Sequence, residues 1–334
     1  MKTPTLNLAD VQLARRRLAG GLRLTPCLPA LKISAIAGAD IWLKRDDLQR
    51  TGSFKERGAR HAILSLSNEE RKRGVVAASA GNHALGLAFH GAALGVRVTV
   101  VMPENAAAVK IARCRGLGAE VILHGDNFEA AQACARKIAV QTGATHVHPF
   151  DDLRVIAGQG TMALEILEQA PALDTLVVPV GGGGLLAGVA TVIKALRPQI
   201  RVIAVEPENA AGFLAACLNG GPHVAPMAPT LADGLAVARV GETTFALAAP
   251  LVDDVVTVSE QELGLAVRVL ACEAGIVAEA GGAAALAAVL AGKIETNVVT
   301  VPIGGRNIDS RLHERIVAGE LPASSTATRV ARAA

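Results

Sequence analysis

Short apolar runs alternate with segments of helical pattern from Gly74 onward, and this alternation limits the folds open to the chain. The runs have strand length and are apolar throughout, which indicates strands buried on both faces of a parallel sheet. Helical segments between them predict βαβ crossovers. This first series predicts strands at 74–79, 97–102, 120–123 and 146–148, and helices through 94, over 106–117 and over 128–142.

A second series of the same kind begins near residue 158. It predicts, in chain order, helix 158–170, strand 175–180, helix 185–196, strand 201–206, a short helix near 210–218, strand 252–258, helices 260–274 and 279–291, and strand 297–303. Ser259 with Glu262, and Ser67 with Glu70, form capping-box patterns that mark helix starts. Residues 219–250 contain several Gly and Pro, which predicts a loop-rich segment.

The two series predict an α/β protein with two three-layer domains, each built on an open parallel sheet, and a cleft between them. At roughly 100–200 residues per domain, 334 residues suit two domains. We expect a small domain at 67–151, inserted in a large domain at 1–66 and 152–320, and a flexible tail at 321–334.

Composition excludes several classes of partner. The 33 basic and 30 acidic residues are too evenly balanced for a nucleic-acid or membrane-surface footprint, and aromatic residues make up only 2%. Five cysteines without paired spacing argue against a disulfide framework or a zinc ribbon. No apolar run reaches the length of a membrane span. We therefore expect a cytoplasmic protein with a small-molecule partner, and neither nucleic acid nor membrane.

Four consecutive glycines, Gly181, Gly182, Gly183 and Gly184, follow an apolar strand and precede a helix. Glycine lets backbone N–H groups approach an anion, and a helix N-terminus adds about half a positive charge, so this turn is a candidate phosphate site. A second interpretation is a relaxed dinucleotide fingerprint, Gly182-x-Gly184-x-x-Ala187, with Glu206 as the ribose-binding acid. That interpretation predicts a nicotinamide-dependent oxidoreductase.

Two further segments carry candidate chemistry. Lys55 lies in the segment TGSFKERG at 51–58, where small, hydroxyl and apolar neighbours can desolvate its amine and lower its pKa, as imine chemistry requires. The segment from Ser79 to His83 follows a strand and offers clustered N–H groups at a helix start, which suit a carboxylate. Asn82 adds an amide for polar recognition.

Together these segments resemble the fold-type II pyridoxal-phosphate enzymes, in particular the threonine/serine dehydratase and serine racemase group. The resemblance runs from about residue 25 to residue 309. It includes LKRDDLQRTGSFK at 43–55, ASAGNH at 78–83, the four glycines, LADG at 231–234 and NID at 307–309. Several separate motifs in the family's order make a chance match improbable. The fold implied is that of the tryptophan synthase β-subunit.

The resemblance implies pyridoxal 5'-phosphate as cofactor and assigns a role to each motif. Lys55 forms the imine with the cofactor and Phe54 packs near it, while Gly181–Gly184 hold its phosphate. Asn82 lies beside its phenolic oxygen, and Gly304 stands where the family carries the Ser or Cys that contacts the pyridine nitrogen. The substrate carboxylate is held by the loop Ser79, Ala80, Gly81, Asn82 and His83. The family also implies a homodimer.

Some positions depart from the family's pattern. Ala80 stands where serine racemases carry a serine, and a methyl group cannot deliver a proton, so racemisation is disfavoured. Glu206 and Ala210 match two of three cation-ligand positions in some relatives, but the third is Gly212, so we expect no metal. Leu85 and Ala280 replace the family's usual Gln and Pro, which indicates a substrate that can differ from threonine.

The resemblance thus implies a lyase that removes water from a small β-hydroxy-α-amino acid, L-threonine or L-serine by default, to give a 2-oxo acid and ammonia. Alternative substrates are 3-hydroxyaspartate, phenylserine and a hydroxyectoine-derived amino acid. Three other functions stay open: an amino-acid racemase, a nicotinamide-dependent oxidoreductase, and an inactive amino-acid sensor of the same fold.

Overall fold

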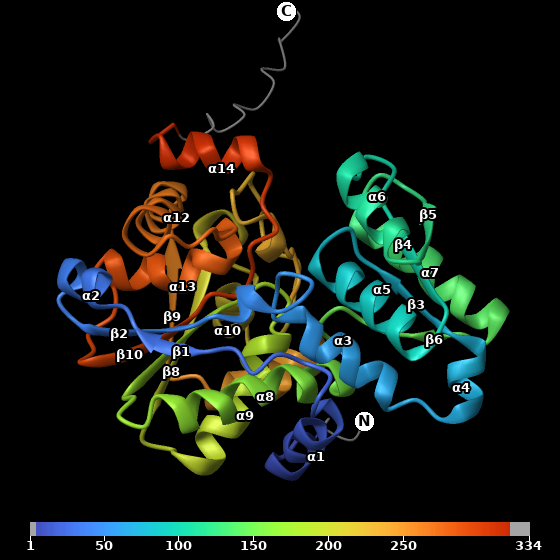
Figure 1. The fold of residues 1–334 in the computed structure, drawn as a ribbon, viewed down its shortest axis with the longest axis horizontal. Helices are drawn as coiled ribbons and strands as arrows, with labels where there is room; N and C mark the ends of the chain where they lie inside the picture. Colours follow the sequence, from blue (N-terminus) through green and yellow to red (C-terminus); the bar gives the residue numbers. More distant parts are fainter. Residues whose placement is uncertain (1–4, 321–334) are drawn as a thin grey trace, which may run out of the picture.

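The structure, a computed structural model, describes residues 5–320 and contains two sheets (Figure 1). The larger sheet has six strands in the order β1-β2-β10-β7-β8-β9, and the smaller has four in the order β5-β4-β3-β6. The tail predicted at 321–334 lies outside the described residues. Within residues 5–320, none of the helices is both long and apolar enough to span a membrane.

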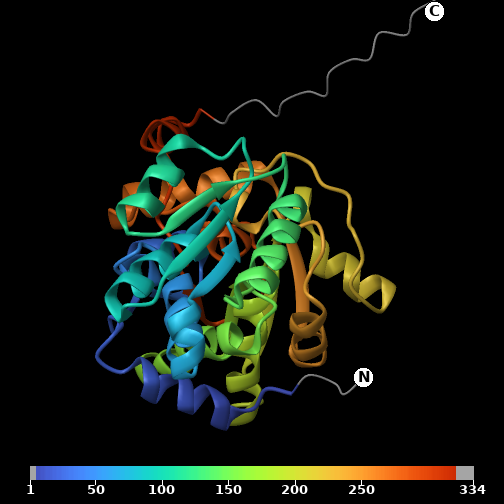
Figure 2. The same cartoon turned by 90° about the vertical axis from the view of Figure 1, so that its right-hand side faces the viewer.

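The small sheet is parallel throughout and is covered on both faces. Its strands are β3 (Val75–Ala78), β4 (Val98–Met102), β5 (Glu120–Leu123) and β6 (Thr145–His146). Its helices are α4 (Asn68–Arg73), α5 (Asn82–Leu94), α6 (Ala108–Gly116) and α7 (Phe128–Thr142). Val75 and Ala77 pack in the core that contains α5, whereas Val76 and Ala78 pack against α7, so β3 is apolar on both sides. Figure 2 shows α7 on the outer face of this sheet.

The large sheet collects strands from both ends of the chain. Its strands are β1 (Cys27–Pro29), β2 (Asp40–Lys44), β7 (Thr175–Pro179), β8 (Arg201–Pro207), β9 (Asp254–Val258) and β10 (Val298–Pro302). One face is covered mainly by α8 (Leu153–Gln169) and α9 (Gly184–Leu196), and the other by α12 (Glu260–Ala274) and α13 (Ala280–Leu290). β2 and β10 are parallel neighbours, with Asp40 opposite Val298.

The remaining elements flank these layers. They are α1 (Leu8–Leu18), α2 (Leu31–Ala37), α3 (Lys55–Leu64), α10 (Gly212–Asn219), α11 (Glu242–Ala248), α14 (Ser310–Val317) and the short turns η1 (Asp46–Leu48), η2 (Glu208–Ala210), η3 (Asp233–Leu235) and η4 (Ala249–Leu251). Helix α3 packs against both α5 and α8 and so lies between the two sheets (Figure 1). Since α3 begins at Lys55, this candidate lysine lies where the two halves of the molecule meet.

The α/β class and the parallel sheets are as predicted, and β5, α7 and α12 match their predicted ranges residue for residue. Both predicted capping boxes are confirmed, at Ser67 and at Ser259. Some details differ from the prediction. The strand predicted at 146–148 is Thr145–His146, and β1 pairs antiparallel with β2 at one edge of an otherwise parallel sheet. The segment predicted to be loop-rich at 219–250 also contains the short helix α11. The helix predicted at 158–170 begins earlier, at Leu153, because the Asp152 carboxylate accepts the Arg154 N–H and caps it.

Candidate active site

Lys55 is the first residue of α3, and its side chain is partly buried between the two sheets. Its Nζ donates a hydrogen bond to the Pro149 carbonyl oxygen at 2.9 Å and lies 5.4 Å from the centre of the Phe54 ring. Burial lowers the pKa of Lys55 from 10.5 to about 8, although the negative charge of Glu279 acts in the opposite direction. An amine with this pKa has a substantial unprotonated fraction near neutral pH, as a nucleophile or general base requires.

The glycine run lies at the carboxyl end of β7 and at the start of α9. Gly183 has φ of +88°, a left-handed conformation that favours glycine. A Cβ on Gly182 would overlap the Phe150 ring, and one on Gly184 would lie 2.8 Å from the Phe150 carbonyl oxygen. The Thr244 hydroxyl donates to the Gly182 carbonyl at 2.7 Å and fixes the turn from a third side. The run is therefore a fixed, crowded turn at a helix N-terminus.

Pro149 and Phe150 connect these two parts of the site. The Pro149 carbonyl accepts the hydrogen bond from Lys55, and the next residue, Phe150, packs directly on Gly182 and Gly184. Neither residue stands out in the sequence. Pro149 acts through its backbone and Phe150 through shape, so neither carries a side-chain pattern that indicates chemistry.

The segment from Ser79 to His83 joins β3 to α5, with Gly81 as the N-cap and Asn82 as the first helical residue. The Ser79 hydroxyl accepts the Gly81 N–H at 3.2 Å. The Asn82 Nδ2 donates to Glu279 Oε1 at 2.7 Å, and its Oδ1 accepts from Asn307 at 2.7 Å. His83 is buried, and this burial lowers its pKa well below the usual value, with the charge of Lys55 acting in the same direction.

Gly304 follows β10 and lies beside Phe54. Its carbonyl accepts the Phe54 N–H at 2.9 Å, and a Cβ at this position would lie 3.3 Å from the Phe54 ring. The adjacent Gly305 faces Ser53 in an antiparallel bridge, and its carbonyl accepts the Glu279 N–H at 3.0 Å. The structure therefore brings Phe54, Lys55, Gly304 and, through Glu279, Asn82 together around one site.

Glu279 is the most significant residue that the site prediction omitted. It precedes α13, and burial together with the nearby charge of Asp233 raises its pKa to about 7. A cavity of about 680 Å³ adjoins it and is lined also by Lys110, Asp233 and Asn307. In the sequence Glu279 is a single acidic residue ahead of an alanine-rich helix, and its place in the site becomes visible only through its burial and its contact with Asn82.

A buried ionic cluster lies behind Lys55 on the same helix. The Arg57 guanidinium donates two hydrogen bonds to Asp46, at 2.6 and 2.8 Å. It donates two more to the two carboxylate oxygens of Glu165, at 2.7 Å each. Burial alone would raise the pKa of Asp46, but Arg57 holds it below its usual value. Lys44 Nζ adds a bond to Glu165 at 2.5 Å. This cluster ties the start of α3 to α8 and to the segment after β2.

The Glu206 carboxylate is hydrogen-bonded to the protein backbone. Its carboxylate accepts the N–H groups of Phe213 and Leu214 at 2.7 and 2.8 Å, at the start of α10. The side chain is fully buried, and burial raises its pKa to about 7. Both oxygens bind this helix start and the side chain is fully buried, so Glu206 is not accessible to a ribose hydroxyl. Within residues 5–320, no group of three or more His, Cys, Asp and Glu side chains is placed to hold a metal ion.

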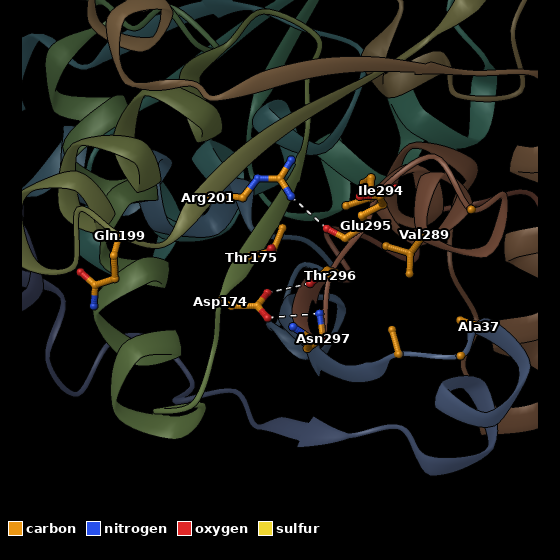
Figure 3. A pocket seen from close by; sticks show the side chains of 13 residues that line it. Ala37, Asp174, Thr175, Gln199, Arg201, Val289, Ile294, Glu295, Thr296 and Asn297 are labelled. Carbon is orange, nitrogen blue, oxygen red and sulfur yellow. Dashed lines mark hydrogen bonds between the residues drawn. The ribbon is translucent and has the colours of Figure 1, made fainter.

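A second cavity, of about 640 Å³, lies at the opposite edge of the large sheet (Figure 3). It is found at the amino ends of β7, β8 and β10, where Asp174 accepts hydrogen bonds from the Thr296 hydroxyl at 2.7 Å and the Asn297 N–H at 3.1 Å. Arg201 donates to the Glu295 carbonyl at 2.9 Å. In open α/β sheets ligands bind at the carboxyl ends of the strands, and the glycine run lies at that edge. The Asp174 cavity is therefore separate from the candidate active site.

The chain belongs to the pyridoxal-phosphate-dependent enzyme family, whose model matches residues 18–304. It is 45% identical over 314 residues to the L-threonine ammonia-lyase of Thermotoga maritima, covering 93% of this chain and 78% of that protein. It is 43% identical over 304 residues to the catabolic L-threonine dehydratase of Escherichia coli strain K12, covering 90% and 92%. Its fold is similar to the crystal structure of serine racemase from Dictyostelium discoideum, with a TM-score of 0.86, 38% identity, and 92% and 100% of the two chains covered.

Family membership makes pyridoxal 5'-phosphate the cofactor, and the residues on this site fit it. The partly buried amine of Lys55 has the lowered pKa that imine formation with an aldehyde requires. The crowded glycine turn presents a helix N-terminus, which suits a phosphate. The nicotinamide interpretation of the same glycines is wrong, since the family is a different one and Glu206 is engaged with α10.

Proposed function

We propose that this protein is a pyridoxal-phosphate-dependent ammonia-lyase that converts a small β-hydroxy-α-amino acid, L-threonine or L-serine, into a 2-oxo acid and ammonia. One observation carries the proposal: two consecutive residues, Pro149 and Phe150, contact both halves of the site. The Pro149 carbonyl accepts a hydrogen bond from the Lys55 amine, whose pKa is lowered, and Phe150 packs on the glycine turn, which has no room for side chains. The names of relatives at 43–45% identity support the same reaction.

Each predicted site residue has a role in this proposal. Lys55 binds the cofactor and later acts as general base, and the N–H groups of Gly181–Gly184 bind the phosphate. With the cofactor bound, Asn82 would donate to the phenolic oxygen, and Phe54 and Gly304 would pack against the ring. The loop of Ser79, Ala80, Gly81, Asn82 and His83 binds the substrate carboxylate.

In the proposed reaction, one side chain of the protein, Lys55, takes the proton from the substrate. When bound, the cofactor supplies a conjugated ring that withdraws electrons from the substrate Cα. The neutral amine of Lys55 accepts the Cα proton, a contribution of about 10²–10⁴-fold to the rate. The Cβ–O bond then breaks, and the hydroxyl leaves as water with a proton that balances the one taken from Cα. The unsaturated amine that remains adds water and releases ammonia, so the net reaction needs no oxidant.

A second candidate function is amino-acid racemisation, which the likeness to a serine racemase favours. Racemisation requires an acid on the face of Cα opposite to Lys55, and Ala80 offers only a methyl group where serine racemases carry a serine. We therefore place racemisation second. A dehydratase of 3-hydroxyaspartate, phenylserine or a hydroxyectoine-derived amino acid is the alternative within the same reaction class.

The test is ammonia release by the purified holoenzyme from a panel of hydroxy amino acids, together with a chiral assay for D-serine formed from L-serine. Lys55→Ala should abolish both the visible absorbance of the bound cofactor and the release of ammonia. The matched control is Lys72→Ala, which removes an exposed lysine of α4 and should change neither. A colourless wild-type protein, or one that forms D-serine faster than ammonia, would contradict the proposal.

We further propose a homodimer in the cytoplasm with no nucleic-acid partner. Balanced charge and the scarcity of aromatic residues support the last point, and family resemblance supports the dimer. Light scattering coupled to gel filtration measures the mass directly; a value near 34.1 kDa, the mass of one chain, would refute the dimer.

A further inference from the structure

Four side chains form a continuous hydrogen-bonded series from the small sheet's helix α6 to the start of α13. Arg113 Nη2 donates to Asn307 Oδ1 at 2.9 Å. Asn307 Nδ2 donates to Asn82 Oδ1 at 2.7 Å, and Asn82 Nδ2 donates to Glu279 Oε1 at 2.7 Å. Asn307 Nδ2 also donates to the Thr51 carbonyl at 2.9 Å. We call Arg113, Asn307, Asn82 and Glu279 the amide series.

The groups at the edges of the amide series fix its direction. A guanidinium can only donate and a main-chain carbonyl can only accept, so Asn307 must turn its oxygen to Arg113 and its nitrogen to Thr51. The same nitrogen then requires an oxygen from Asn82. The Asn82 nitrogen is thereby directed to Glu279, and its second hydrogen stays available to another acceptor.

Reversal of either amide would bring like groups together. If Asn82 alone turned over, its nitrogen would meet the Asn307 nitrogen and its oxygen would meet the Glu279 carboxylate. An unmade hydrogen bond to a partly buried group disfavours a state by about tenfold or more. An isolated Asn82 would have no such preference, because the two ends of an amide have nearly the same shape.

We propose that Asn307, held by Arg113 and by the Thr51 carbonyl, is a positioning residue that fixes which end of the Asn82 amide faces the cofactor. The proposal rests on the proposed role of Asn82 beside the phenolic oxygen. An N–H group there stabilises negative charge on that oxygen, whereas an amide oxygen would repel it. Asn307 thus affects the electronic state of the cofactor through Asn82.

Arg113 also makes this orientation depend on the position of α6. It is an exposed side chain of the small sheet's helix, whereas Asn307 belongs to the loop that follows β10 of the large sheet. A second residue of α6, Lys110, pairs with Asp233 of η3 at 2.9 Å. Both contacts form only when α6 lies against the large sheet's loops, but only Arg113 belongs to the amide series.

The test compares Asn307→Asp with Asn307→Ala. The carboxylate of Asn307→Asp still pairs with Arg113 but cannot donate to Asn82. A reversed Asn82 amide gains a hydrogen bond to this carboxylate, which offsets the unfavourable contact of its oxygen with Glu279. The orientation that presents the amide oxygen to the cofactor should therefore become populated. We expect a shifted visible absorbance band of the bound cofactor and about tenfold weaker binding of pyridoxal phosphate. We also expect kcat for ammonia release to fall by about tenfold, with KM changed by less than about threefold. Asn307→Ala, which frees Asn82 to take both orientations, should give a smaller shift in the same direction.

Two comparisons separate this role from a structural one. Thermal unfolding of the cofactor-free variants reports whether Asn307 matters only for stability, and if Asn307→Asp does not fold, Arg113→Leu replaces it and should shift the band in the same direction. Lys110→Ala removes the other contact of α6 and should shift the band less than Asn307→Asp.

Unchanged absorbance and cofactor affinity in both Asn307 variants would overturn the proposal, and so would an equal band shift in Lys110→Ala. A wild-type protein that binds the cofactor but releases no ammonia would refute the proposed function instead. In that case the absorbance and affinity measurements would still decide the role of Asn307.

Discussion

Gly182 offers a sharp test of the phosphate site, because the available space at this position is the only property that the substitution changes. The backbone of Gly182 is not left-handed, so alanine causes no strain in φ. Its Cβ would overlap the Phe150 ring, whereas a Cβ on Gly221 meets nothing within 4 Å. Gly182→Ala and Gly221→Ala therefore form a matched pair that differs in crowding alone.

The expected magnitude follows from that crowding. Overpacking at Phe150 should lower the free energy of unfolding of the cofactor-free protein by about 1–3 kcal/mol. Displacement of the turn should weaken cofactor binding by about 100-fold or more, the equivalent of two charge-assisted hydrogen bonds at about 1.5–3 kcal/mol each. Gly221→Ala should leave cofactor binding unchanged and alter stability by less than about 1 kcal/mol.

The assay is a titration of each cofactor-free variant with pyridoxal phosphate, followed by absorbance, with urea unfolding of the same samples. Phe150→Ala in the Gly182→Ala background removes the overlapping ring and should recover part of the lost affinity. If Gly182→Ala binds the cofactor as tightly as the wild type while losing stability, the turn is structural and the phosphate lies elsewhere.

Three other predictions concern buried charges. Since Lys55 has a pKa of about 8 in the folded protein against 10.5 when unfolded, the unfolded state holds more protons between these values. The unfolding free energy of the cofactor-free protein should therefore rise with pH in this window, and Lys55→Met should abolish the rise in urea titrations. The pKa of Glu279 is raised from 4.5 to about 7, so stability should fall as pH rises through this range, and an unchanged slope in Glu279→Gln would contradict the assignment. Arg57→Met leaves Asp46 and Glu165 without their guanidinium and should cost about 3–5 kcal/mol in urea unfolding; a loss below about 1 kcal/mol would refute the importance of the cluster.

β3 and β7 could be predicted because each is apolar on both faces, and such runs stand out in the sequence. The antiparallel edge could not. β1 has only three residues, and β2 pairs with a strand more than 250 residues later, so local pattern carries no trace of either partner. Helix α11 is not apparent in the sequence because it follows a stretch with several Gly and Pro.

The residues of the candidate site also fall into those that the sequence indicates and those that only the fold reveals. Lys55 and the glycine run lie in compact local patterns, and the sequence indicates them directly. Pro149 and Glu279 matter only through what folding brings next to them, a distant amine and a distant amide. Arg57 resembled any other charged helix residue until its burial placed it between two carboxylates.

The pairing of β2 with β10 has a consequence for the chain during its synthesis. Residues 40–44 leave the ribosome early, but their parallel neighbour in the sheet is the strand at 298–302. Most of the protein must therefore be synthesised before β2 and β10 can pair. Until then β2 offers an unpaired edge to any other extended chain, the situation that leads to aggregation. Chains truncated before residue 298 should therefore be insoluble, whereas truncations after residue 302 should leave more of the protein soluble.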